Sequence, residues 1–420
     1  MHLTFKLSFI FSLLLSFTGV GLFAQSEVII NPPDHIKSIV LSSQKTNDYS
    51  PIVRLGNPIV LEFDDLEGDQ KQYSYTIEHY DYYWKKSNIN TTEYLDGFTN
   101  DWIRDFENSF NTIQGYTHYR LRLPNDNLRI KSSGNYVISV IDENDEVVFT
   151  RPFIVYESKV DVGVSVHRSR DIATINTMQN IQFSVNHPNL LLNNPSLELK
   201  VVVYQNLDWN TVIKDIKPQF IRGTQLLYKY GANVNFWGGN EFLFFDTKQI
   251  RGAVNNIARS ELKDTFNTYL YTDEARENRP YTFYPDVNGN FVLRTIDNES
   301  IATEGAYTKV HFTLDLYGNK ASDTIYIYGD FNEWQLTDEN KLIYNTQSKL
   351  YEGSLFLKQG FYNYSYVTTD QDNEVNKYEI DGSFYQTENN YTVLVYYKPI
   401  GSRFDQVIGI GNANSENLRN

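Results

Sequence analysis

The chain has 420 residues, a formal net charge of −15 and no cysteine. The acidic balance would repel nucleic acid and anionic lipid head groups, and the absence of cysteine excludes both a disulfide framework and lipid attachment through a cysteine. The length fits two or three domains, and 32 Tyr and 26 Phe against two Met favour a strand-rich structure.

The first 24 residues are typical of a cleaved secretory signal. One Lys precedes an apolar run, and Ala24 ends the segment before Gln25. The apolar run is short and is interrupted by Ser, Thr and Gly, which favours a signal peptide over a membrane anchor. An exported chain of this size without disulfides suits a bacterial periplasm.

Short strands are predicted along almost all of the remaining chain. They alternate in polarity or are rich in β-branched residues, and Gly, Pro, Asn or Asp bound them, as in NPIVLEF, QYSYTIEHY, NYVISVI, LELKVVVY and YTVLVYY. Their regular spacing predicts an all-β fold of tandem, immunoglobulin-like β-sandwiches. One segment, NNIARSELKDTFN, is instead predicted to form a short helix.

Two changes along the chain predict domain boundaries. Near Glu157 one strand is followed directly by another, and near Ile301 a new set of evenly spaced strands begins after a polar stretch. The predicted division is a signal peptide at 1–24, an N-terminal sandwich at 25–157, a middle sandwich at 158–300, a C-terminal sandwich at 301–400, and a Gly/Asn-rich tail at 401–420.

Motifs for catalysis and for metal or cofactor binding are weak. The seven His show no pair at zinc spacing, and no Gly-rich phosphate loop is present. The acidic run from Asp370 to Asp381 imitates part of a calcium loop, but Val375 stands where that loop needs Gly, which favours a solvated hairpin. We therefore predict no enzyme activity, no cofactor and no metal. Because carboxylates are plentiful, a glycan hydrolase with an acid and base pair between domains remains an open alternative.

The stretch YIYGDFNEWQ, residues 326–335, predicts a strand followed by a turn. With Gly329, Asp330, Phe331, Asn332 and Trp334 it resembles the strand and turn of the early-set β-sandwich in glycogen-binding modules. The resemblance implies that Trp334 stacks on a glucose ring and that Asn389 or Asn390 assists it. Ser365 replaces the Lys of that class, and no Trp follows Trp334. A carbohydrate-binding protein that uses this C-terminal sandwich is the alternative function.

An aromatic cluster between Tyr73 and Trp84 is a candidate partner surface. On a strand, one face would carry Tyr80, Tyr82 and Trp84, and the opposite face would carry the other aromatic side chains. Two aromatic faces cannot both be exposed without cost. We expect most of the cluster to be core, with part of one face left for a partner, and the candidate contacts are Tyr80, Tyr82 and Trp84.

Longer runs give a more specific resemblance over nearly the whole chain. YSYTIEHYDYYWKKSNINTTEYLDGF, YQNLDWNTVIKDIKPQFI and DGSFYQTENNYTVLVYYKPIGSRFDQVIG are similar to segments of the plug protein of the bacterial type IX secretion system. The resemblance implies a non-enzymatic periplasmic protein on the inner side of the outer membrane. Such a protein binds the periplasmic end of the large translocon β-barrel and seals it when no cargo is passing. It implies no nucleic-acid partner and no direct membrane span.

Overall fold

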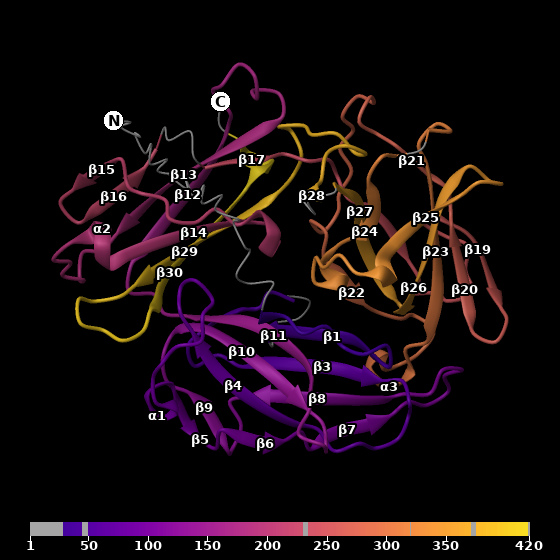
Figure 1. Ribbon diagram of the computed structural model, residues 1–420, viewed down its shortest axis with the longest axis horizontal. Coiled ribbons are helices and arrows are strands. Elements are labelled where there is room, and N and C mark those ends of the chain that lie inside the picture. Colours follow the sequence, from indigo (N-terminus) through magenta and orange to yellow (C-terminus); the bar gives the residue numbers. More distant parts are fainter. Residues whose placement is uncertain (1–27, 44–48, 230–233, 320, 371–374, 419–420) are drawn as a thin grey trace, which may run out of the picture.

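The computed structural model describes residues 28–43, 49–229, 234–319, 321–370 and 375–418. Figure 1 shows three lobes of β-strands that meet at the centre of the molecule, so the all-β prediction is confirmed. The α-helices in the described residues are single turns, namely α1 (Thr91–Tyr94), α2 (Pro195–Glu198) and α3 (Ile301–Glu304). None of them is long and apolar enough to cross a membrane. The predicted signal peptide, 1–24, lies outside the described residues.

The first lobe is a sandwich of two sheets with strand orders β1-β3-β8-β7 and β2-β11-β10-β4-β6, and β5 pairs separately with β9. Alternation along the strands turns Phe63, Tyr119, Tyr136 and Phe153 into the core between the sheets. Its strands are β1 (Ile36–Ser43), β2 (Ile52–Arg54), β3 (Ile59–Asp65), β4 (Ser74–Tyr80), β5 (Leu95–Gly97), β6 (Asn100–Trp102), β7 (Asp105–Asn108), β8 (Thr117–Leu123), β9 (Leu128–Ile130), β10 (Gly134–Ile141) and β11 (Val147–Tyr156).

The middle lobe packs the sheet β12-β13-β16-β15, with β17 beside β13, against the sheet β14-β29-β30. Valines at alternate positions, including Val201, Val203, Val393 and Val395, fill the space between them. Its strands are β12 (Asp161–Arg168), β13 (Met178–Asn186), β14 (Leu199–Gln205), β15 (Phe220–Arg222), β16 (Gln225–Tyr228), β17 (Asn235–Trp237), β29 (Asn390–Tyr397) and β30 (Gln406–Asn414).

The third lobe is built from one continuous sheet whose main path runs β18-β27-β24-β25-β26-β23-β20-β19. The sheet encloses an aromatic core that contains Phe245, Phe312, Tyr362 and Tyr364. Its strands are β18 (Leu243–Asp246), β19 (Ile257–Leu262), β20 (Phe266–Leu270), β21 (Asp273–Glu274), β22 (Phe291–Leu293), β23 (Tyr307–Asp315), β24 (Thr324–Tyr328), β25 (Lys341–Asn345), β26 (Leu350–Lys358), β27 (Gly360–Thr369) and β28 (Val375–Asn376).

The strand pairing differs from the predicted division of the chain in two places. The segment from β18 to β22, which lies before the predicted boundary at residue 300, belongs to the sheet of the third lobe. β29 and β30 leave that lobe and pair with β14 of the middle lobe, and β30 occupies much of the predicted tail at 401–420. Pairing between distant segments decides both cases, and strand spacing along the sequence does not reveal it.

The predicted helix at NNIARSELKDTFN is wrong. Residues 257–262 form β19, which pairs with β20 in an antiparallel hairpin. β20 in turn lies parallel to β23, and its Phe266 and Leu270 are buried. Burial against a neighbouring strand outweighs the helical propensity of this short segment.

Candidate functional site

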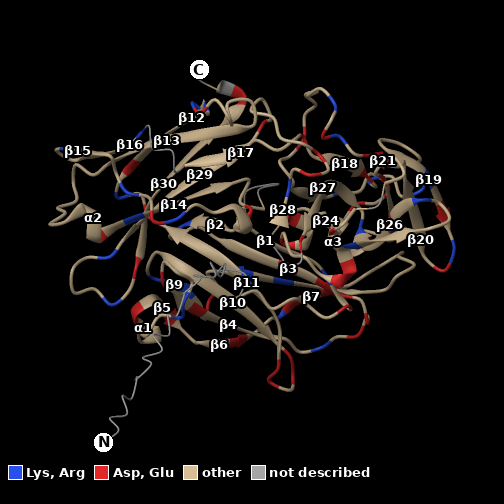
Figure 2. Ribbon diagram, turned by 45° about the horizontal axis from the view of Figure 1, so that its top comes forward, with Lys and Arg blue, Asp and Glu red and all other residues tan. Residues whose placement is uncertain are grey.

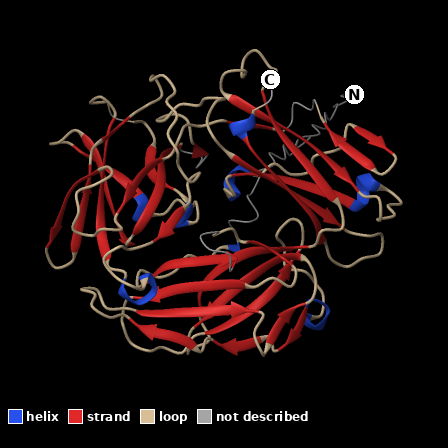
Figure 3. Cartoon of the chain, turned by 180° about the vertical axis from the view of Figure 1, so that it is seen from behind, coloured by secondary structure: helices blue, strands red, loops and turns tan. Residues whose placement is uncertain are grey.

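An aromatic cluster holds the three lobes together where they meet. The lobes surround this junction in the view from behind as well (Figure 3). The cluster takes side chains from every lobe, and all of them are buried: Tyr82 and Trp84 from the first, Tyr204, Trp209, Leu394 and Tyr396 from the middle, and Tyr328, Trp334 and Val367 from the third.

Two of the predicted partner contacts lie inside this junction. Tyr82 is 1% exposed, and its hydroxyl donates to the carbonyl of Val201 at 3.1 Å in the middle lobe. Trp84 has a φ of 59° and is 3% exposed, with its ring edge-on to Trp209 at 6.2 Å between centroids. Tyr80, the third candidate, is half-buried. Tyr82 and Trp84 therefore bind the middle lobe of the same chain and offer no surface to another protein.

Trp334, the predicted sugar-stacking residue, is buried on the third-lobe side of the junction. Glu333 and Trp334 both have left-handed backbone angles, 54° and 57°, which turn the indole inward after the strand. Its ring centroid lies 5.0 Å from that of Tyr328, and it is 2% exposed. Gly289 makes room for the indole, because a Cβ there would sit 2.3 Å from the ring. The indole has no face open to a sugar.

The predicted assisting amides lie in the middle lobe. Asn389 is 3% exposed and donates to the carbonyl of Gly238 at 2.8 Å, and Asn390 is exposed at the start of β29. Asn389 and Trp334 line the same crevice together with Ser365, but its volume is about 60 Å³. That is far below the roughly 300–1,000 Å³ of small-molecule sites. The geometry does not favour the carbohydrate-binding alternative.

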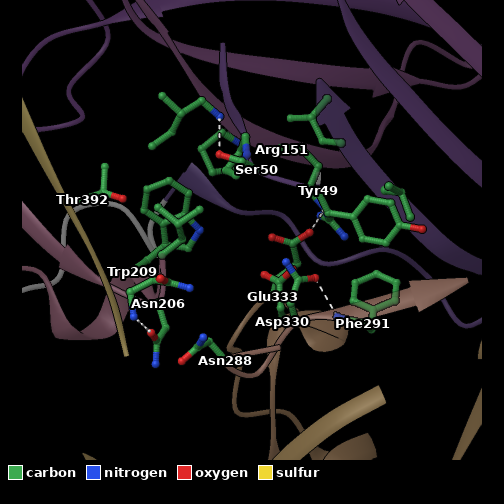
Figure 4. Close-up of a pocket in the computed structure, with 18 of the residues that line it drawn as sticks. Tyr49, Ser50, Arg151, Asn206, Trp209, Asn288, Phe291, Asp330, Glu333 and Thr392 are labelled. Atoms are coloured by element: carbon green, nitrogen blue, oxygen red, sulfur yellow. Dashed lines mark hydrogen bonds and ion pairs between the residues drawn. The ribbon is translucent and has the colours of Figure 1, made fainter. Parts of the chain in front are cut away.

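A larger cavity of about 400 Å³ opens beside the junction and is lined by all three lobes (Figure 4). Arg151 of the first lobe points toward Glu333 of the third, and its Nε lies 2.9 Å from Oε1 of that carboxylate. Burial lowers the pKa of Arg151, and Glu333 opposes this effect. Burial and the nearby Glu333 raise the pKa of Asp330 well above its usual range. Part of the cavity wall is thus an ion pair between the first and third lobes.

A second buried ion pair joins the first and third lobes at a different point. Nζ of Lys358 in β26 donates to Oδ2 of Asp64 in β3 at 2.7 Å, and both side chains are 1% exposed. The hydroxyl of Tyr307 donates to the same oxygen at 2.6 Å, and Nδ1 of His118 lies 2.7 Å from the other. Burial raises the pKa of Asp64, but Lys358 and His118 outweigh it, so the pKa is lowered overall. This network fixes the angle between the two lobes.

The middle and third lobes are joined in the same way. Asp208, which precedes the turn that carries Trp209, forms an ion pair with Lys377 and accepts a hydrogen bond from the hydroxyl of Tyr328 at 2.9 Å. Nδ2 of Asn210 donates to the carbonyl of Trp334 at 2.8 Å. The contacts between lobes therefore combine apolar packing with buried polar pairs. Removing one partner of a buried ion pair is strongly destabilising, because the other charge is left buried without compensation.

Sequence reasoning missed these charged residues. Arg151 stands inside VVFTRPFIVY and Lys358 ends SLFLK, so each is a charge within a buried strand pattern. Such a charge is expected to have a buried partner, and this is the signal that could have drawn attention to them. The partner itself could not be named, because Lys358 and Asp64 are 294 residues apart in the sequence.

Taken together, the fold and its junction define a β protein of three lobes that pack on one another. The profile of the type 9 secretion system plug protein 1st domain matches residues 36–157, which is the first lobe. A crystal structure of a hypothetical protein from Parabacteroides merdae ATCC 43184 is similar over 92% of this chain and 98% of its own, with 32% identity and a TM-score of 0.88.

The chain belongs to the type IX secretion system plug protein family, and its function is associated with that secretion system. A Pseudomonas fluorescens alkylpurine DNA glycosylase bound to DNA aligns over 29% of each chain at 15% identity, and its TM-score of 0.17 supports no argument. No curated protein matches the chain.

Proposed function

We propose that the protein is a non-enzymatic plug subunit, which binds the periplasmic end of the outer-membrane translocon barrel of the type IX secretion system and seals it when no cargo is passing. The observation that carries this proposal is the match of the first lobe to the plug family. The match over nearly full length to the Parabacteroides merdae protein extends the shared architecture to the other two lobes.

The architecture supports this role on physical grounds. A barrel wide enough for folded cargo would leave the outer membrane open to solutes, so its periplasmic end needs a stopper. Ion pairs at Arg151, Lys358 and Lys377 link the third lobe to the other two. A preformed body binds a rim with little ordering cost, which suits reversible closure.

The proposed location is the periplasm, on the inner side of the outer membrane, after removal of the signal peptide at 1–24. The formal charge of −15 supports a protein that stays off anionic lipid surfaces and reaches the membrane through its protein partner.

Co-purification with the translocon tests the proposal. Tagged protein recovered in mild detergent is expected to carry the barrel, most of all from cells that lack cargo. Cells without the plug should also admit large solutes that are normally excluded, and restoring the gene should remove this leak. Recovery without the barrel, together with unchanged permeability, would disprove the proposal.

A further inference from the structure

One continuous segment of the first lobe carries five exposed large apolar side chains. We call residues 98–113 the docking ribbon. Within these 16 positions the exposed residues are Phe98 (66%), Trp102 (48%), Phe106 (36%), Phe110 (64%) and Ile113 (49%). Aromatic side chains are the ones that most often anchor interaction sites, and here four of them lie exposed along one segment.

The docking ribbon contains two open strand edges. β6 is the last strand of one sheet of the first lobe, and β7 is the last strand of the other, in the part of the chain that the structure describes. Figure 1 shows both strands along the margin of the first lobe that faces away from the other two lobes. An open edge can accept an additional extended strand through its backbone N–H and C=O groups.

The backbone of the docking ribbon is held in place by a buried side chain, an ion pair and a tight turn. Between the two edge strands, Ile103 is 5% exposed and its N–H donates to the carbonyl of Tyr73 at 2.8 Å. The guanidinium of Arg104 forms two hydrogen bonds with Asp101, at 2.6 and 2.9 Å. At the start of the ribbon, Gly97 has a φ of 117° and leaves space for the carbonyl of Asn127. The aromatic side chains are therefore presented on an ordered backbone.

Charge decides which kind of chain fits the edge. Asp105 and Glu107 are exposed and occupy alternate positions of β7, so they project from one face of the strand. Acidic positions lie along this margin in Figure 2. In an antiparallel pairing of two copies centred on Phe106, Asp105 would face Glu107 of the second copy, and like charges directly opposite each other are destabilising. A strand with Lys or Arg at alternate positions would be attracted instead.

We propose that the docking ribbon is the surface through which the protein binds the translocon, and that its occupant is an extended translocon segment with Lys or Arg at alternate positions, paired along β7. Apolar side chains of that segment pack on Phe98, Trp102 and Phe110, on either side of the pairing. This inference rests on the proposed function only in naming the translocon as the source of the strand.

Affinity measurements with purified translocon in detergent test the inference. The variant Phe98→Ser/Trp102→Ser/Phe110→Ser should raise Kd at least about 100-fold, since three anchors are removed and each is expected to contribute about fivefold or more. Asp105→Lys/Glu107→Lys should weaken binding at least about tenfold and reverse its dependence on salt, because salt would then screen repulsion between like charges.

Phe220→Ser/Ile221→Ser is the matched control. These two side chains are 49% and 51% exposed on β15, an edge strand of the middle lobe. The control should bind like the wild type. The changed side chains are exposed, so circular dichroism should show that every variant remains folded. Asp105→Lys/Glu107→Lys should lose a little stability, because position 105 lies opposite Arg120 of β8.

A second measurement uses the absence of cysteine in the chain. Asn108→Cys in β7 and Ile221→Cys in β15 each provide a unique attachment point for a photo-crosslinker. Crosslinks from position 108 to a basic extended segment of the translocon, with none from position 221, support the inference.

The outcomes separate this inference from the proposed function. If wild type and ribbon variants bind the translocon equally, the docking ribbon is not the contact and the plug function stands. If the wild type itself fails to bind the translocon, both the plug function and this inference are disproved. If the wild type forms a dimer that the ribbon variants do not form, the occupant is a second copy and the inference is overturned.

Discussion

The junction and the docking ribbon use the same aromatic residue types in opposite ways. At the junction Trp84 and Trp209 are buried and pack on each other across two lobes, and Trp334 is buried against Tyr328 of its own lobe. Along the docking ribbon Trp102 and Phe110 are exposed, and the backbone beneath them is fixed by Ile103. Aromatic content alone therefore does not reveal a binding surface, because burial decides whether a ring contributes to stability or to recognition.

The sharpest test of this difference compares two tryptophans. Trp334→Ala removes a side chain that is 2% exposed, so it should lower the free energy of unfolding by about 3–5 kcal/mol. Trp102→Ala, at 48% exposed, should change it by about 0.5 kcal/mol or less. Urea unfolding of both variants measures the contrast.

The same pair separates stability from binding. Translocon affinity should fall with Trp102→Ala, while any folded fraction of Trp334→Ala should bind normally. Equal stability losses in the two variants would remove the distinction between the regions.

Removal of one charge from the buried ion pair between the first and third lobes should be nearly as damaging. Lys358→Met leaves the carboxylate of Asp64 buried without its cation, and this should cost about 3–5 kcal/mol of unfolding free energy. Lys309→Met is the matched control, because Lys309 is exposed on the neighbouring β23.

A double variant then tests whether the effect comes from the ion pair. Lys358→Met/Asp64→Asn should be less destabilised than the sum of its single variants, since no uncompensated charge remains. Additive losses would show that Lys358 stabilises the contact between the first and third lobes through packing alone.

Acid should weaken the contact between the first and middle lobes through His79. Burial lowers the pKa of His79 to about 4, and its ring lies 5.3 Å from that of Phe404 of the middle lobe. The unfolded chain binds a proton below about pH 6.5 while the folded protein stays neutral there, so stability falls from pH 6.5 to about 4 by up to roughly 3 kcal/mol.

His79→Gln should flatten that part of the pH profile, as measured by urea unfolding at a series of pH values. His118 has the opposite sign. Burial lowers its pKa, but hydrogen bonds to Asp64 and Glu62 outweigh burial and raise it overall. Its contribution is complete below the unfolded pKa and is lost as the pH rises through the folded one. An unaltered acid slope in His79→Gln would assign the loss to other groups.

How much the sequence predicted depends on whether an effect is local. Alternation and turn residues gave the all-β fold, because strand polarity is decided by immediate neighbours. The return of β29 and β30 to β14 was not predictable, since it depends on pairing across nearly 200 residues. The inward turn of Trp334 depends on left-handed angles at Glu333 and Trp334, which neither residue type favours.

For the functional sites, too, the sequence did not reveal features that depend on contacts between distant segments. Tyr82 and Trp84 were predicted to contact another protein, but they pack on the middle lobe of the same chain, and strand alternation cannot reveal such partners. The docking ribbon gave no signal in the sequence, because the exposure of Phe98 and Phe110 depends on which strands end their sheets.

The smallest expected effect concerns the support of the docking ribbon. Hydrogen bonds from Arg104 hold the pKa of Asp101 at about 2, with a further contribution from Asn127. Arg104→Ala should move this pKa up toward the ordinary value of about 3.9, as measured by NMR titration of the carboxyl group.

Stability should change little at neutral pH, because the side chain of Arg104 is 61% exposed, although Asp101 is largely buried. The favourable contribution of Asp101 is present above the unfolded pKa and is lost as the pH falls through the folded one, so Arg104→Ala should shift that loss to higher pH. Arg104→Ala should also accelerate amide exchange between Phe98 and Ile103, because the backbone loses a support. If the ordered backbone contributes to recognition, translocon affinity should fall several-fold as well. Faster exchange with unchanged affinity would mean that the partner orders the docking ribbon itself, and that pre-ordering contributes nothing to binding.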